Sequence, residues 1–333
     1  MRTVDVHAHV ATPAADQLLA DQPGFSEQLA AEAATMGAAT AAYNREHFAA
    51  LIGRLTDVGA RLRAMDAGGI DVQTVSPTPT SRHWLEEALA ATYVERVNTA
   101  VAAHCAQAPD RLRPVATVTT HLPALAETQL RYAVSELGAV GVQISTTAAN
   151  GVELDTPTLD PFWAAVVELD VPVLIHPWGC SLGSRLDIAY LFNHLGNPTE
   201  TSLALSRLIF GGVLDRFPEL RLWSAHGGGW LPSYSGRADH AWHARSDART
   251  CAQPPSWYLR RMWFDSLVYT EPALRHLVQA VGAEQVTLGT DFPFDMGVED
   301  PVERVRQAFD DPGLREAICS RSAVALFGGR LPS

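Results

Sequence analysis

The chain has 333 residues and no lysine, so arginine accounts for all 25 residues counted as lysine plus arginine. Without lysine, the chain cannot form a Schiff base with a carbonyl substrate, and it lacks the lysine of a Walker-type phosphate loop. It also cannot supply the carbamylated lysine with which some enzymes bridge two metal ions. Several classes of enzyme are therefore excluded.

Cysteine is scarce as well. The four cysteines lie far apart in the sequence, and no two of them form a Cys-x-x-Cys pair. Neither a zinc ribbon nor a thioredoxin-like redox motif is therefore indicated. We expect Cys105, Cys180, Cys251 and Cys319 to be free thiols.

Long hydrophobic runs and basic runs are also missing. No apolar run reaches the length of a membrane span, and Met1 leads directly into a strand-like segment instead of a secretory signal. The formal net charge of −12 argues against a surface for nucleic acid or anionic membranes, although a local group of arginines can still bind a small anion. We expect a cytoplasmic enzyme with a small-molecule substrate.

What the sequence does contain is a repeated alternation of strand-like and helical segments. The expected strands are residues 3–7, 72–76, 114–118, 140–144, 171–175, 220–225, 262–266 and 285–289. The expected helices between and after them are residues 85–108, 124–137, 161–169, 201–214, 271–281 and 302–309. Eight such repeats predict an α/β fold of the (β/α)₈ TIM-barrel type. A doubly wound sheet would instead carry a glycine-rich nucleotide turn after its first strand.

Residues 12–68 form an insertion between the first and second expected strands. The insertion is rich in alanine and contains a helical candidate from Glu46 to Ala64. Because the loops that follow barrel strands lie at the catalytic face, we expect this insertion to form a lid or a wall of the site. We expect residues 1–333 to form one domain; two domains divided near residue 155 are the less favoured alternative.

The first expected strand ends in His7-Ala8-His9. Because side chains alternate along a strand, residues two apart point the same way, and both imidazoles can reach one metal ion. Two histidines on one face also occur on solvated strands. The pair therefore indicates a metal site only if other segments supply further ligands.

Four later strands also end in residues capable of chemistry. These ends carry His176-Pro177-Trp178, His226-Gly227-Gly228-Gly229, Asp265-Ser266 and Thr290-Asp291-Phe292-Pro293. The carboxyl ends of barrel strands meet at the catalytic face. A buried histidine bonded to backbone, or an aspartate that caps a helix, would explain any one of them. Five such ends together indicate a functional site.

His7, His9, His176 and Asp291 would give three nitrogen ligands and one oxygen ligand with room for water. This set suits Zn²⁺ best and tolerates Mn²⁺, Co²⁺ or Fe²⁺. A neutral His226 imidazole would take a proton from water on the metal; a fifth metal ligand or a supporting hydrogen bond are its alternative roles. Asp265 either orients one of the histidines or caps a helix.

In their order and spacing, these motifs resemble the amidohydrolase superfamily, and within it the branch of non-hydrolytic decarboxylases typified by 2-amino-3-carboxymuconate-6-semialdehyde decarboxylase. The resemblance runs from Val4 to about Phe327 and includes Met65-Asp66-Ala67 and Arg237. It implies a (β/α)₈ barrel with one zinc ion held by His7, His9, His176 and Asp291, and His226 as the acid/base residue. It also implies a homodimer in which Arg237 reaches the neighbouring active site and holds a substrate carboxylate.

One position departs from that family. Its other carboxylate-binding arginine lies in the insertion, and counting back from Met65 places that position near Ala49. Arg45 and Arg54 flank Ala49 and would replace that arginine after a short gap. We further expect Trp178 and Tyr190 to form an aromatic wall of the pocket, with burial in the core as the alternative.

We therefore expect a metal-dependent carboxy-lyase that removes CO₂ from an unsaturated or aromatic carboxylic acid. The resemblance favours 2-amino-3-carboxymuconate-6-semialdehyde or a close analogue as substrate. The alternatives are a hydrolase or hydratase on the same barrel, or a decarboxylase of a salicylate or resorcylate, in which Asp291 would protonate the ring. A metal-binding protein without catalytic activity is a more distant alternative.

Overall fold

The computed structural model describes residues 2–80, 82–148 and 152–332. Eight parallel strands follow one another around the sheet in sequence order. They are β1 (Val4–Val10), β2 (Val72–Pro77), β3 (Leu112–Thr117), β4 (Gly141–Ile144), β5 (Val173–Ile175), β6 (Leu222–Ser224), β7 (Trp263–Asp265) and β8 (Val286–Thr287). The residues after β8 close the ring, because the backbone N–H of Val6 donates to Leu288 and that of His9 donates to Phe292. The predicted barrel and its eight strands are confirmed.

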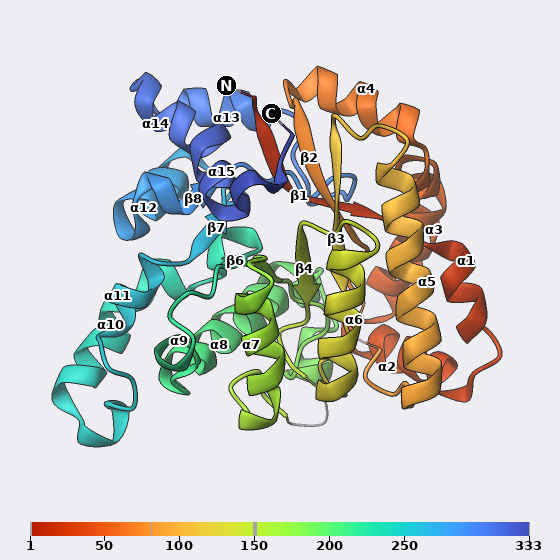
Figure 1. Cartoon of the computed structure of the whole chain (residues 1–333), viewed down its shortest axis with the longest axis horizontal. Coiled ribbons are helices and arrows are strands. Elements are labelled where there is room, and N and C mark those ends of the chain that lie inside the picture. Colours follow the sequence, from red (N-terminus) through yellow and green to blue (C-terminus); the bar gives the residue numbers. More distant parts are fainter. Residues whose placement is uncertain (1, 81, 149–151, 333) are drawn as a thin grey trace.

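Helices surround the strands on the outside, as Figure 1 shows. Those that follow β2 and the later strands are α5 (Glu87–Cys105), α6 (Pro123–Ser135), α7 (Asp160–Glu168), α8 (Asn197–Phe210), α9 (Val213–Arg216), α10 (Leu231–Ala244), α11 (Pro255–Leu259), α12 (Glu271–Val281), α13 (Pro301–Ala308), α14 (Pro312–Glu316) and α15 (Ser322–Phe327). The expected helix 201–214 is divided in the structure. It ends before the Gly211-Gly212 pair, where Gly212 adopts φ +70°, and α9 begins after the pair.

The insertion after β1 consists of α1 (Pro13–Asp16), α2 (Pro23–Met36), α3 (Ala38–Thr56) and α4 (Val58–Gly68). The single helix expected from Glu46 to Ala64 is wrong, because the chain turns at Asp57. The backbone of Asp57 is extended, and its carboxylate accepts a hydrogen bond from the N–H of Ala60. Asp57 therefore caps α4 and ends α3.

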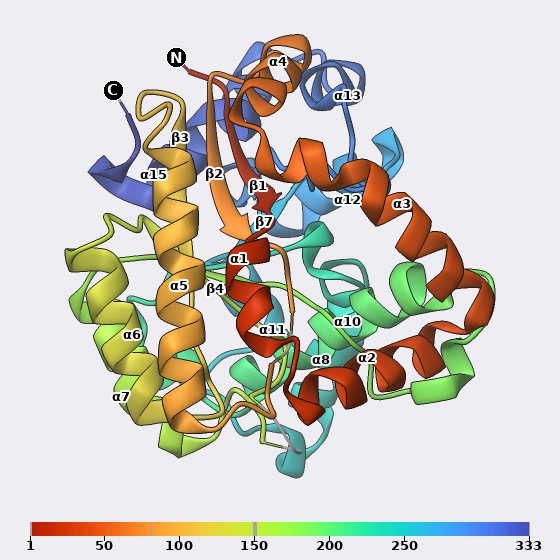
Figure 2. The ribbon, with the colours of Figure 1, turned by 90° about the vertical axis from the view of Figure 1, so that its right-hand side faces the viewer.

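The insertion also reaches the opposite side of the barrel. Met36, at the end of α2, packs against Leu186 and Phe192, which follow β5. Figure 2 shows α1 just below the ends of β1 and β2, α2 and α3 on the right of the view, and α4 near the end where the chain starts. The end of α2 therefore contacts the segment that follows β5.

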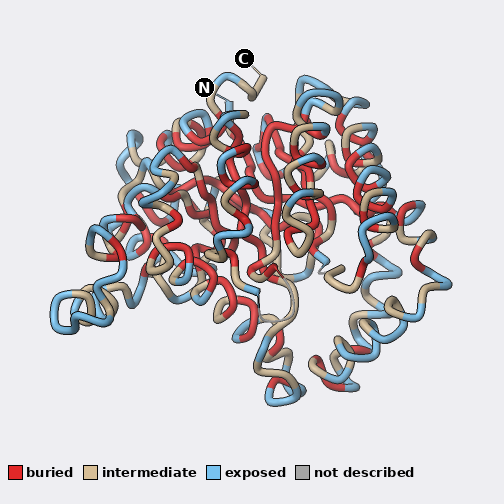
Figure 3. Tube along the Cα trace, turned by 60° about the horizontal axis from the view of Figure 1, so that its bottom comes forward, coloured by how far each residue is buried: buried red, intermediate tan, exposed pale blue. Residues whose placement is uncertain are grey.

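The buried residues form the strands and the inward faces of the helices, as Figure 3 shows. At the amino-terminal end of the barrel, apolar strand residues meet α15, where the rings of Trp223 and Phe327 lie 5.2 Å apart. Because apolar side chains fill this end of the barrel, polar chemistry is confined to the carboxyl ends of the strands.

Candidate metal centre and active site

Four of the predicted residues come together at the carboxyl ends of the strands. His7 and His9 lie on β1, His176 follows β5 and Asp291 follows β8. One ligand atom from each side chain lies within 4.8 Å of the others, and all four residues are buried. The structure therefore brings segments that are far apart in the sequence to one point.

The partners of the three imidazoles determine which nitrogen of each ring faces that point. Nδ1 of His7 lies 2.6 Å from Oδ2 of Asp265, Nδ1 of His9 lies 3.2 Å from the Pro77 carbonyl oxygen, and Nδ1 of His176 lies 2.9 Å from that of Pro177. Each acceptor places a proton on Nδ1, so the lone pair of a neutral ring is on Nε2. This is the tautomer in which histidine binds metals through Nε2.

The Nε2 atoms fit a shared cation. Those of His7 and His9 are 3.1 Å apart, and Nε2 of His9 is also 3.1 Å from Oδ1 of Asp291. Nε2 of His176 is buried without a hydrogen-bond partner among the described residues. Lone pairs brought together in this way repel one another unless a positive charge lies between them. The three nitrogens and one carboxylate oxygen fit a single divalent metal ion.

The electrostatics of the four residues favour a positive charge between them. Burial lowers the pKa of both His9 and His176. Burial also acts to lower the pKa of His7, but the carboxylates of Asp291 and Asp265 raise it to about 9. Burial acts to raise the pKa of Asp291, yet neighbouring histidines, His7 above all, hold it well below its usual range. The two carboxylates therefore favour a positive charge at this point.

Asp265, at the end of β7, connects the metal cluster to the next strand end. Its Oδ2 accepts from Nδ1 of His7 and, at 2.8 Å, from the backbone N–H of His226. Its Oδ1 accepts from the backbone N–H groups of Gly227 and Leu267. Asp265 thus orients His7, which is the first of the two roles expected for it.

His226 lies beside the four ligands. Its Nε2 is 3.4 Å from Oδ2 of Asp291, and its ring centre is 5.3 Å from that of His7 and 5.2 Å from that of His176. The side chain is 14% exposed, whereas those of His7 and His9 are fully buried. An imidazole in this position can exchange a proton with a molecule that contacts the metal.

The three glycines after His226 are required by packing. Gly227, Gly228 and Gly229 all have positive φ. A Cβ atom would lie 2.3 Å from Val268 at Gly227, 2.6 Å from Phe264 at Gly228 and 2.2 Å from the Pro198 carbonyl oxygen at Gly229. The glycines therefore allow the chain to turn closely against β7 and α8 while it presents His226.

Aromatic residues lie around the cluster, and sequence reasoning found only some of them. Tyr190 has φ +60°, and burial together with Asp295 and Asp291 raises the pKa of its hydroxyl. Tyr269, which was not predicted, has φ +63°, and burial and the same two aspartates are among the causes that raise its pKa. Phe294, also not predicted, has its ring centre 5.4 Å from that of His9. Both residues lie within four positions of a predicted strand-end aspartate, which is the signal that could have found them.

Trp178 lies two positions after His176 and is half-buried. Its ring packs at 5.5 Å against Phe192, and its Nε1 donates to Glu32 of α2. Trp178 therefore joins the end of β5 to the insertion.

The three arginines considered for substrate binding are not gathered at the cluster. Arg45 is exposed on α3. Arg54 forms an ion pair of 3.0 Å with Glu299 and lies over the ring of Phe292, 5.1 Å from its centre. Arg237 is exposed on α10, which Figure 1 shows far from α1 to α4. Within the described part of the chain, no ion pair joins any of the three to Asp291.

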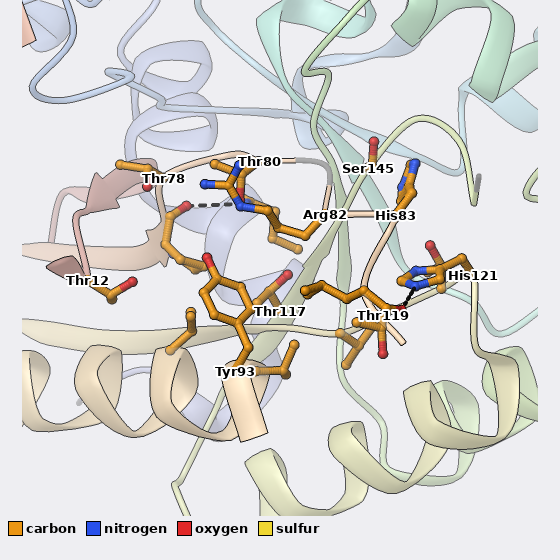
Figure 4. Close-up of a pocket in the computed structure, with 17 residues that line it drawn as sticks. Thr12, Thr78, Thr80, Arg82, His83, Tyr93, Thr117, Thr119, His121 and Ser145 are labelled. Carbon is orange, nitrogen blue, oxygen red and sulfur yellow. Dashed lines mark hydrogen bonds between the residues drawn. The ribbon is translucent and has the colours of Figure 1, made fainter. Parts of the chain in front are cut away.

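A small polar cavity lies beside the cluster, at the ends of β2, β3 and β4. Arg82 and Tyr93 lie on one side of it and His83 and His121 on the other, with threonine side chains between them (Figure 4). Pro77, whose carbonyl accepts from His9, also lines it. Its volume of about 50 Å³ is enough for a few water molecules.

Within the described residues, no helix is long and apolar enough to cross a membrane.

Comparisons with known proteins agree with this arrangement. The sequence model of the family described as Amidohydrolase matches residues 4–329. The chain is 34% identical over 244 residues to 2-amino-3-carboxymuconate-6-semialdehyde decarboxylase of Dictyostelium discoideum, and this match covers 72% of this chain and 68% of that protein. It is 30% identical over 289 residues to gamma-resorcylate decarboxylase of Rhodococcus jostii, with coverage of 79% and 84%.

The chain is also similar to the solved structure of a decarboxylase. The 5-carboxyvanillate decarboxylase of Novosphingobium aromaticivorans, complexed with manganese and 4-hydroxy-3-methoxy-5-nitrobenzoic acid, superposes with a TM-score of 0.83 and 26% sequence identity. The superposition covers 98% of this chain and 96% of that one. All three of these proteins are decarboxylases.

Proposed function

Because the chain belongs to the amidohydrolase family, we propose that it is a metal-dependent decarboxylase that releases CO₂ from an unsaturated or aromatic carboxylic acid without hydrolysis or oxidation. The observation that carries the proposal is the convergence of His7, His9, His176 and Asp291 with His226 beside them. Two relatives and one similar structure that are decarboxylases support the reaction class. We assign the whole chain to one domain, with residues 12–68 as a wall of its site.

The metal would be held by His7, His9, His176 and Asp291, and it would polarise a substrate oxygen and stabilise negative charge as the reaction proceeds. We propose zinc, which suits three imidazoles and one carboxylate. Manganese is the chief alternative, since the similar solved structure contains it.

His226 would carry the proton. A proton delivered from its Nε2 to the carbon that bears the carboxylate would allow the bond to CO₂ to break, with its electron pair returning to the conjugated system. Asp291 lies 3.4 Å from the same nitrogen and is the alternative proton carrier for a hydroxybenzoate ring. Asp265 holds the backbone of His226, so the imidazole is oriented before substrate arrives.

The substrate carboxylate would be held by Arg237 of a neighbouring copy, because Arg237 is exposed on α10, and Figure 1 shows α10 far from α1 to α4. The enzyme would then be a homodimer. Arg45 and Arg54 are the candidates within the insertion, and Trp178 and Tyr190 would form an aromatic wall.

We propose 2-amino-3-carboxymuconate-6-semialdehyde or a close analogue as substrate, since a relative with 34% identity is named for it. A resorcylate-type acid is the second candidate, supported by the relative with 30% identity. We place the enzyme in the cytoplasm.

The test is a screen of carboxylated muconates and hydroxybenzoates for CO₂ release by the purified protein, after its bound metal has been measured. We expect CO₂ from at least one of these acids, loss of activity after chelation, and recovery when Zn²⁺ or Mn²⁺ is returned. Hydrolysis or hydration of esters, lactones or double bonds without CO₂ release would overturn the proposal in favour of the alternatives.

A further inference from the structure

A buried polar network contacts the backbone of the four-residue cluster. Its members are Asp5, Arg61, Gln73, His104 and Thr290, and the side chains of Asp5 and Arg61 are completely buried. Arg61 comes from α4 of the insertion, whereas Asp5 and Gln73 come from β1 and β2. None of these five residues belongs to the proposed catalytic group.

The network begins at an irregularity in β1. Asp5 pairs with Gln73 of β2, but the next pair joins Ala8 to Val75, so β1 contains one extra residue between them. A bulge of this kind leaves backbone groups outside the regular ladder and changes the direction of the side chains that follow. Here the side chain at the bulge is the ligand His7.

Asp5 satisfies the backbone groups that the bulge leaves free. Its Oδ1 accepts from the N–H of His7 at 3.0 Å and from that of Thr290 at 3.1 Å. Its Oδ2 accepts from the hydroxyl of Thr290 at 2.6 Å. One carboxylate thus fixes the backbone of His7 and of the residue before Asp291, so two ligands from different strands are positioned together.

Arg61 fixes the second histidine of β1. Its guanidinium donates to the backbone carbonyl of His9 and also to Nε2 of His104 at 3.0 Å. The same group lies 5.0 Å from the ring centre of Phe292, the residue after Asp291. Arg61 therefore touches both strand ends that supply β1 and β8 ligands.

Gln73 connects the guanidinium of Arg61 to the carboxylate of Asp5. Its Oε1 accepts from Arg61 at 2.6 Å, and its Nε2 donates to Oδ2 of Asp5 at 2.7 Å. A guanidinium and a carboxylate buried this deeply are tolerated because each is hydrogen-bonded and they are connected through this amide. Loss of Gln73 would remove one hydrogen-bond partner from each of these two buried charges.

We propose that Asp5, Gln73 and Arg61 are positioning residues that hold His7, His9 and Asp291 at the spacing a metal ion requires, and that Arg61 makes metal retention depend on how the insertion is seated. This inference rests on the proposed metal-dependent function. Asp5 and Arg61 touch the backbone of His7 and His9, and Gln73 connects their two side chains.

The test measures binding of Co²⁺ alone, without substrate, to the metal-free protein by competition with a chromophoric chelator. The visible spectrum of the Co²⁺ form reports its coordination. The variants are Arg61→Met and Gln73→Leu, and the matched control is Arg63→Met, which changes an exposed arginine on the same helix. We expect Co²⁺ binding about 10- to 100-fold weaker in the first two, with an altered spectrum, and unchanged in the control.

Circular dichroism shows which variants are folded at the temperature of the measurement. Folded Arg61→Met or Gln73→Leu protein with the Co²⁺ affinity and spectrum of the unchanged chain would overturn the inference. If Arg61→Met does not fold, Gln73→Leu decides, because it leaves both charges in place and removes only their connection. Failure of the unchanged chain to bind Co²⁺ would instead overturn the proposed function itself.

Discussion

At the scale of single residues, the site depends on which ring nitrogen of each histidine has a hydrogen-bond partner. Three rings have Nδ1 bonded to an acceptor and turn Nε2 toward one point. His226 differs, because its Nδ1 is buried without a hydrogen-bond partner in the described part of the chain, and its Nε2 faces Asp291. This difference supports the proposal that three histidines bind metal and the fourth carries a proton.

Replacement of His226 by alanine tests this division of roles. We expect the rate of CO₂ release to fall at least about 100-fold, the usual contribution of a positioned acid or base, because the proton carrier is lost. The metal content should remain as in the unchanged chain, since the four ligands are intact. Metal analysis together with a CO₂ assay checks both statements. A variant that keeps its metal and its full turnover would show that Asp291 or solvent supplies the proton.

At the scale of elements, the turn after β6 presents His226 only because three glycines follow it. Replacement of Gly228 by alanine places a Cβ 2.6 Å from the ring of Phe264 at φ +77°. We expect the free energy of unfolding to fall by about 2 to 5 kcal/mol, from left-handed strain and overpacking. Gly53→Ala is the control, because nothing lies within 4 Å of its Cβ in α3 and a helical alanine stabilises by about 0.5 to 1 kcal/mol. Urea unfolding of both variants checks the contrast; equal stability would show that the turn relaxes freely.

The elements were predicted well where periodicity and chain order determine them. The eight strands, the barrel and the convergence of four strand-end residues follow from local pattern together with the rule that the carboxyl ends meet. The family resemblance is confirmed by the match over residues 4–329. The break of the insertion helix at Asp57 was missed, because α3 and α4 have continuous helical composition and only the extended backbone of Asp57 separates them.

The buried partners of the site were harder to predict. In the sequence, Arg61 does not differ from the other arginines of the insertion. Only the tertiary fold brings its guanidinium to the backbone carbonyl of His9. The bulge in β1 has no local sequence signal, because a register shift depends on both strands. Residues that act through contacts distant in sequence therefore remained outside the prediction.

At the scale of the whole molecule, the charge on Arg61 links stability to pH. Burial and the neighbouring Arg61 lower the pKa of His104 to about 4, while Asp57 and the backbone of Thr56 act to raise it. In the unfolded chain the pKa of histidine is near its ordinary value of 6.5. Between pH 4 and pH 6.5 the unfolded state therefore binds a proton on His104, and the folded state does not. The contribution of His104 to the free energy of unfolding is complete above pH 6.5 and is lost as the pH falls toward 4.

The variant His104→Gln keeps an acceptor for Arg61 and removes this proton. We expect the decrease in unfolding free energy between pH 6.5 and 4 to be shallower in the variant, by at most about 1.4 kcal/mol per pH unit. Thermal or urea unfolding at several pH values measures the slope. The same slope in both proteins would mean that His104 does not contribute, and that other groups such as His83, whose pKa is also lowered to about 4, dominate.

The proposed dimer predicts that one active site is built from two copies of the chain. If Arg237 serves the neighbouring site, His226→Ala and Arg237→Ala chains are each impaired alone, but a mixed dimer contains one site with an intact His226 and an intact Arg237. Random exchange of subunits makes half of the dimers mixed, each with one working site of two, so the mixture should recover about one quarter of full activity. CO₂ release after the two variants are dissociated and reassembled together measures this recovery. Each variant chain lacks a residue that the other keeps, so only a site shared between copies can regain both. No recovery beyond the sum of the separate variants would therefore place Arg237 in its own site or outside catalysis.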